Sequence, residues 1–152
     1  MTLRLAATAD AGALSQAHAF GFDDPWSAAD IRSLFAGHGV FGFLVTEAGR
    51  PVGMLILRVV MEDAEILTVA VDPVARSRGV GRALVQAAVD RAQAAGATAV
   101  FLEAAVDNDP ALALYARAGF RRAGLRTGYY DRGAAGLVDA VAMRLDLPGA
   151  TA

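Results

Sequence analysis

The sequence contains no cysteine and no lysine, and these two absences exclude several kinds of chemistry. Without cysteine, the chain has no disulfide framework, no thiolate metal site and no thiol nucleophile. Without lysine, it has neither a Schiff-base amine nor a Walker A loop, whose lysine contacts the phosphates. All 14 basic residues are therefore arginines.

Long apolar runs and a strong net charge are also missing. No stretch of about 18 uncharged apolar residues predicts a membrane span, and the first residues do not resemble a signal peptide. The net charge of −2 argues against non-specific binding to nucleic acid or to an acidic membrane surface. With 152 residues, 55% of them hydrophobic, we expect a cytoplasmic protein of one domain. We assign the domain to residues 1–147 and expect a flexible tail over residues 148–152.

The hydrophobic pattern predicts strands that alternate with helices. A strand over residues 3–6 precedes two helices, the first capped by Asp10 and the second by Ser27. Three further strands, separated by short turns, form an antiparallel meander over residues 40–47, 52–61 and 65–71. A helix, a strand, a helix capped by Asp109 and a closing strand pair follow over residues 79–95, 98–106, 110–119, 120–130 and 138–145. This order predicts an α/β (α+β) domain with a mixed sheet of about seven strands flanked by about four helices.

A glycine-containing loop joins the third meander strand to the next helix. Its residues are Arg76, Ser77, Arg78, Gly79, Val80, Gly81 and Arg82. A helix N-terminus presents unpaired N–H groups to phosphates, and glycine lets the backbone come close to them. Leu84 replaces the third glycine of a dinucleotide fingerprint, and a meander fits a doubly wound sheet poorly. The loop indicates a ligand with several phosphates; the alternative is a surface turn with solvated arginines.

Several motifs resemble the GNAT family of N-acetyltransferases over nearly the whole chain. They are Val69-Ala70-Val71-Asp72-Pro73, Arg76-x-x-Gly79-x-Gly81, Asn108, and Ala113-Leu114-Tyr115 with Gly119-Phe120. Pro25-Trp26-Ser27, Leu102-Glu103 and Gly128-Tyr129-Tyr130 are similar to the RimI type, which acetylates the N-terminal alanine of a small-subunit ribosomal protein. The sequence departs from that type at Leu137-Val138, where a charged pair is common.

The resemblance implies a role for each matching residue, with acetyl-CoA as cosubstrate and no metal. The backbone of Val69, Ala70 and Val71 would pair with the pantetheine arm. Arg76, Ser77, Arg78, Gly79, Val80, Gly81 and Arg82 would hold the pyrophosphate, and Asn108 would contact the cofactor. Glu103 would be the general base and Tyr115 the general acid, while Trp26 and Tyr130 would contact the acceptor. The partner would be a ribosomal protein N-terminus, without direct contact to nucleic acid or membrane.

Other interpretations remain open at this stage. The acceptor is alternatively a small-molecule amine, or the chain binds acyl-CoA without catalysis. Tyr115 and Trp26 also fit ordinary core positions, and Glu103 also fits a salt bridge at a sheet edge. The lone histidines His18 and His38 fit structural or exposed positions. The arginines that follow the last predicted helix fit a solvated face; they are Arg117, Arg121, Arg122, Arg126 and Arg132.

Overall fold

The computed structural model describes residues 1–148, so most of the predicted tail lies outside the described residues. In chain order the helices and strands are β1 (Thr2–Ala6), α1 (Ala11–His18), α2 (Ala28–Phe35), β2 (Val40–Glu47), β3 (Arg50–Val60), β4 (Asp63–Val71), α3 (Val80–Ala94), β5 (Ala99–Ala105), α4 (Asp109–Arg117), β6 (Arg121–Asp131) and β7 (Leu137–Asp146). Short 3-10 turns precede α1 and α3 and join β6 to β7. The predicted order of elements is therefore confirmed.

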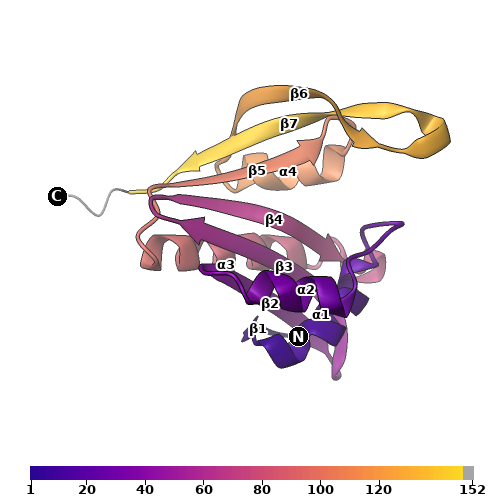
Figure 1. The fold of residues 1–152 in the computed structure, drawn as a ribbon, viewed down its shortest axis with the longest axis vertical. Coiled ribbons are helices and arrows are strands. Elements are labelled where there is room, and N and C mark those ends of the chain that lie inside the picture. Colours follow the sequence, from indigo (N-terminus) through magenta and orange to yellow (C-terminus); the bar gives the residue numbers. More distant parts are fainter. Residues whose placement is uncertain (149–152) are drawn as a thin grey trace.

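The seven strands form one mixed sheet in the order β1-β2-β3-β4-β5-β7-β6 (Figure 1). β2, β3 and β4 are antiparallel neighbours, as the meander predicted, and β1 adds to β2 in the same sense. β5, β7 and β6 form a second antiparallel set. β4 and β5 are joined in parallel, with α3 as the crossover. The predicted fold class is thus confirmed, with four helices and seven strands among the described residues.

Helices cover both faces of the sheet, and each face has its own core. On one face α1 packs on β3 and β4, and α2 packs on α1 and β2; on the other, α3 and α4 form the second layer (Figure 1). β3 is buried on both sides, so Met54 and Ile56 join the first core while Leu55 and Leu57 join the second. Because successive side chains of a strand alternate in direction, a nearly continuous apolar run is what a strand covered on both faces requires.

β4 and β5 separate after a short stretch of pairing. Their parallel pairing covers only Asp63, Ala64 and Glu65 of β4. Immediately afterwards Leu67 has no partner on β3, since Leu57 pairs with Ile66 and Ile56 with Thr68. Such a bulge bends its strand and increases the local twist. The two strands therefore diverge toward their carboxyl ends, as Figure 1 shows.

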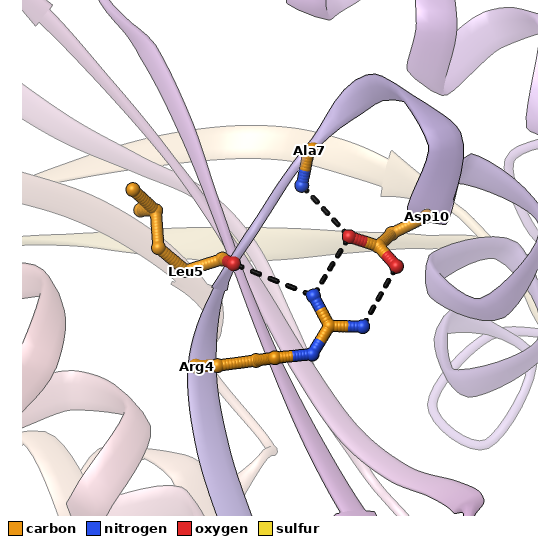
Figure 2. Close-up of polar contacts among 4 residues, drawn as sticks. All are labelled: Arg4, Leu5, Ala7 and Asp10. Carbon is orange, nitrogen blue, oxygen red and sulfur yellow. Dashed lines mark hydrogen bonds and ion pairs between the residues drawn. The ribbon is translucent and has the colours of Figure 1, made fainter.

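Two of the three predicted helix caps differ in the structure. The carboxylate of Asp10 caps no N–H of α1; it accepts from the Ala7 N–H and pairs with Arg4 at 2.8 Å (Figure 2). A nearby guanidinium competes successfully with the helix for this carboxylate. The cap of α4 is Asn108, one residue before the predicted Asp109, with its side chain accepting from the Ala111 N–H at 3.3 Å. Ser27 caps α2 as predicted, in a reciprocal pair with Asp30.

Arginine supplies the cation in every ion pair found among residues 1–148. Most of these pairs lie on the surface, where one pair contributes little to the free energy of unfolding. Arg50 with Asp72 is different, because the Asp72 side chain is 6% exposed. None of the described helices is long and apolar enough to cross a membrane.

Candidate active site

The residues predicted to pair with the cofactor lie where β4 has left β5. Val69, Ala70 and Val71 follow the last β4–β5 pair and the bulge, and they pair with β3 on one side only. On the side of β5 their backbone groups have no strand partner in the described structure. Backbone N–H and C=O groups require partners, so this edge suits an extended ligand that carries amides. We call residues 69–71 the cofactor strand.

The loop over residues 76–82, which we call the phosphate loop, ends in the first turn of α3. Gly79 is the N-cap residue and has a φ of 83°, a left-handed conformation that glycine adopts without strain. Ser77 has a φ of 70°. Val80, Gly81 and Arg82 form the first turn of the helix, where N–H groups have no intrahelical acceptor. The loop therefore presents successive N–H donors at the positive end of a fifteen-residue helix.

The three arginines of the phosphate loop are not equally available to a ligand. Arg78 pairs with Glu47 at 2.9 Å, and Arg76 donates to the Phe20 carbonyl at 3.5 Å. Arg82 is exposed and makes no ion pair within the described part of the chain. A phosphate would therefore contact Arg82 without first breaking a protein contact.

Asp72 fixes the turn from the cofactor strand into the phosphate loop. Its side chain accepts from the Val74 N–H at 3.0 Å and from Arg50 at 3.1 Å, while its own N–H donates to the Val52 carbonyl. From the sequence, Asp72 was only part of the Val69-Ala70-Val71-Asp72-Pro73 motif and had no predicted role of its own. Its burial and its arginine partner, 22 residues away in the chain, are visible only in the structure.

Glu103 lies on β5, the strand from which β4 has separated before the cofactor strand begins. Its side chain is 26% exposed and pairs with Arg126, with 3.3 Å between Oε1 and Nε. The Tyr130 hydroxyl donates to the Glu103 carbonyl at 3.3 Å. Glu103 is therefore both accessible and paired, which explains how a carboxylate interrupts an otherwise apolar strand.

Tyr115 on α4 and Tyr130 on β6 both have raised pKa values. Burial raises the pKa of Tyr115 well above its ordinary value, and Tyr130 adds to the effect. Burial, the neighbouring Tyr129 and Glu103 raise the pKa of Tyr130 to about 12. Tyr115 makes an edge contact with Phe120, and its hydroxyl has no hydrogen-bond partner among residues 1–148. Tyr130 thus contacts Glu103 directly and lies near enough to Tyr115 to raise its pKa, which links three of the residues selected from the sequence.

Two further predicted residues, Trp26 and Asn108, are engaged in contacts of their own. Trp26 lies in the segment between α1 and α2, on the face of the sheet opposite α4, and lines an open hollow of about 400 Å³ with three residues of α2. The Asn108 side chain is engaged as the cap of α4. Contact of Asn108 with a cofactor therefore stays a prediction, and it competes with the cap.

This geometry defines a class of protein. The sequence matches the model of the Acetyltransferase (GNAT) family over residues 12–120. The match covers more than half of the chain and includes β2 to α4, with the phosphate loop and the two diverging strands. The chain therefore belongs to the GNAT acetyltransferase family.

Within the family, the chain is similar to proteins that are named as N-terminal acetyltransferases. The chain is 34% identical to the [ribosomal protein bS18]-alanine N-acetyltransferase of Escherichia coli, over 87% of this chain and 85% of that protein. It is 39% identical to the N-alpha-acetyltransferase RimI of Mycobacterium tuberculosis, over 86% and 82% of the two chains. A crystal structure of the ribosomal-protein-S18-alanine N-acetyltransferase from Escherichia coli superposes with a TM-score of 0.84 at 30% identity, covering 99% of this chain and 97% of the other. The resemblance predicted from the motifs is confirmed.

Proposed function

We propose that this protein transfers the acetyl group of acetyl-CoA directly to the N-terminal alanine amine of a small-subunit ribosomal protein. One observation carries the proposal: β4 leaves β5 before the cofactor strand, so the unpaired backbone edge of residues 69–71 borders the same gap between strands as β5, the strand that carries Glu103. The relatives named for this activity support the choice of acceptor. A ribosomal acceptor also favours a cytoplasmic location.

The chemistry of the acceptor fits a single carboxylate base. A protein N-terminal amine has a pKa near 8, against about 10.4 for lysine, so it needs only modest help to lose its proton near neutral pH. Glu103 would remove this proton, directly or through a water, as the amine nitrogen bonds to the acetyl carbonyl carbon. A backbone N–H near Val71 would stabilise the developing charge on the carbonyl oxygen.

Departure of the CoA thiolate completes the transfer when the carbon–sulfur bond breaks. Tyr115 would donate its proton to the sulfur, whose thiol pKa is about 8.5 by analogy with cysteine. Burial raises the pKa of Tyr115, so this transfer is more uphill than for an ordinary tyrosine. We therefore assign Tyr115 a secondary contribution, as a donor that acts late in bond cleavage.

The arginines that follow α4 support a protein acceptor without direct contact to nucleic acid. Arg121 pairs with Asp146, Arg126 with Glu103 and Arg132 with Asp107. A surface whose arginines are largely paired attracts phosphates weakly. The alternative acceptor is a small-molecule amine.

Mass spectrometry of peptides that differ only in their first residue tests the proposal. Each peptide is incubated with the protein and acetyl-CoA, beside a polyamine and an aminoglycoside. We expect acetylation of the alanine peptide in preference to the others. Transfer to the small amines without transfer to any peptide would overturn the proposed acceptor. Binding of acetyl-CoA without any transfer would overturn the enzymatic function itself.

A further inference from the structure

His18, at the end of α1, is the buried histidine of the molecule and takes no part in the proposed chemistry. It is 2% exposed, whereas His38 is exposed. Its ring stacks on Phe22, with 4.2 Å between the centroids, and on Trp26, with 4.8 Å. A buried polar ring requires partners for both nitrogens, because an unpaired buried donor or acceptor is costly.

Both ring nitrogens have such partners, from two distant parts of the chain. The Trp26 N–H donates to Nδ1 at 3.0 Å, so Nδ1 carries no proton. Nε2 lies 3.1 Å from Oγ1 of Thr68 on β4 and, in this tautomer, donates to it. Burial lowers the pKa of His18 to about 4, which keeps the ring in this neutral form near pH 7. The ring thus bridges the α1–α2 segment and β4.

Further contacts hold the same segment on β4 and on the phosphate loop. A Cβ at Gly21 would lie 3.2 Å from the Ala70 Cβ, so the backbone of Gly21 lies directly on the cofactor strand. Arg76 of the phosphate loop donates to the Phe20 carbonyl. Ser15 donates to the Trp26 carbonyl at 2.7 Å, so both backbone groups of Trp26 are fixed.

We propose that His18 is a positioning residue that fixes the segment between α1 and α2, residues 19–27, on β4 next to the cofactor strand. Through its contact with Thr68, His18 attaches the segment proposed to bind the acceptor to β4, the strand proposed to bind the cosubstrate. The segment carries Trp26, the predicted acceptor contact, and Gly21, which touches Ala70. Movement of this segment therefore changes acceptor binding, whereas β4 stays in place through its pairing with β3.

Two substitutions of His18 each keep one of its two hydrogen bonds, to the Trp26 N–H or to Thr68, and remove the other. In His18→Asn the amide oxygen reaches the place of Nδ1 and still accepts from the Trp26 N–H. In His18→Gln the amide reaches the place of Nε2 and retains the Thr68 contact, but leaves the Trp26 N–H without an acceptor. His38→Gln is the matched control on an exposed histidine.

The chain's single tryptophan gives a readout that needs neither substrate. Acrylamide quenching of Trp26 fluorescence measures how firmly the segment is held. We expect the quenching constant to rise in the order wild type, His18→Asn, His18→Gln, with His38→Gln equal to wild type. Equal quenching in wild type and His18→Gln would overturn the proposal.

The kinetic test rests on the proposed acetyl transfer. We expect His18→Gln to raise KM for the alanine peptide about tenfold, or about 1.4 kcal/mol, with His18→Asn in between. KM for acetyl-CoA and kcat should stay within about twofold, because uniform loss of acceptor binding affects only the acceptor KM. A matching rise in both KM values, or equal effects of the two variants, would indicate a merely structural role and overturn the proposal. If wild type transfers to no amine, the proposed function fails, while the quenching order still tests His18.

Discussion

The two halves of the sheet are stabilised in different ways. In the half from β1 to β4, strand β3 is buried over seven consecutive residues by helices on both faces. In the half from β5 to β7, strand β6 is exposed along most of its eleven residues and forms the edge of the sheet. Three residue pairs between β4 and β5 join the halves.

This difference separates the two tasks of the proposed reaction. The cofactor strand and the phosphate loop belong to the half that side-chain packing holds. Glu103, Tyr115 and Tyr130 belong to the half in which the exposed strand β6 is held mainly by backbone pairing with β7. In the proposed reaction, the half on the β4 side of this separation would bind the cosubstrate and the half on the β5 side would supply the proton transfers. The predictions below test this division.

Glu103→Gln should have the largest effect, because it should lower kcat without changing the binding of acetyl-CoA. The amide cannot accept the amine proton, so kcat should fall about 100- to 1000-fold. The binding constant for acetyl-CoA, measured by calorimetry, should not change, because the cofactor strand and the phosphate loop lie in the other half and Glu103 is not a predicted cofactor contact. Glu65→Gln is the matched control, since Glu65 is also paired with an arginine, Arg58, on a neighbouring strand. A kcat near that of wild type would remove Glu103 from the mechanism.

Acid should destabilise the protein through His18. Burial lowers the pKa of His18 from 6.5 to about 4, so the unfolded chain takes up a proton before the folded one. The stabilisation is complete above pH 6.5 and is lost as the pH falls toward 4, by about 3 kcal/mol in all. Urea unfolding of wild type and His18→Phe at pH 7 and pH 4 measures it. The pKa of Asp10 is lowered from 3.8 to about 2, so its effect falls below this window. An equal loss in both proteins would contradict the assignment.

Tyr115→Phe should reduce kcat less than Glu103→Gln does. A tyrosine whose pKa is raised by burial is a weak proton donor, so we expect kcat to fall about 30-fold, below the usual range for acid–base catalysis. The thermal midpoint should not decrease, because the hydroxyl has no partner among the described residues. A lowered midpoint with unchanged kcat would make Tyr115 an ordinary core residue.

Gly79→Ala should weaken acetyl-CoA binding a few-fold. A left-handed alanine costs about 1 kcal/mol, and relief of this strain would rotate the N–H groups of the phosphate loop. Gly49→Ala is a close control, because Gly49 has a φ of 76° and, like Gly79, open space around the position of a Cβ. Both variants should lose similar stability, and only Gly79→Ala should raise KM for acetyl-CoA. Equal KM values would remove the phosphate loop from cofactor binding.

Arg132→Gln should have the smallest effect. The change removes the exposed pair with Asp107, whereas the β6–β7 pairing on both sides of the turn remains. Exposed pairs contribute little, so the thermal midpoint and both KM values should equal those of wild type. A large loss of stability would show that ion pairs, rather than strand pairing, hold the β6–β7 end of the sheet.

The order of elements and the positions of Glu103 and Tyr115 were predictable from local patterns. Apolar periodicity marks each strand and helix, and Gly79 and Gly81 mark the loop before α3. The separation of β4 from β5 was not predictable, because the bulge at Leu67 is defined only by pairing with β3. The contact of His18 with Thr68 was not predictable either, since the two residues lie 50 positions apart in the chain. Contacts between distant segments carry little signal in a single sequence.

The use of arginine for every ion pair among the described residues has a consequence for a protein that handles acetyl-CoA. Acetyl thioesters modify lysine amines spontaneously, which removes the positive charge. A guanidinium stays protonated at any physiological pH and is a poor nucleophile. Contacts such as Arg50 with Asp72 are therefore resistant to damage by the reagent that the protein is proposed to bind.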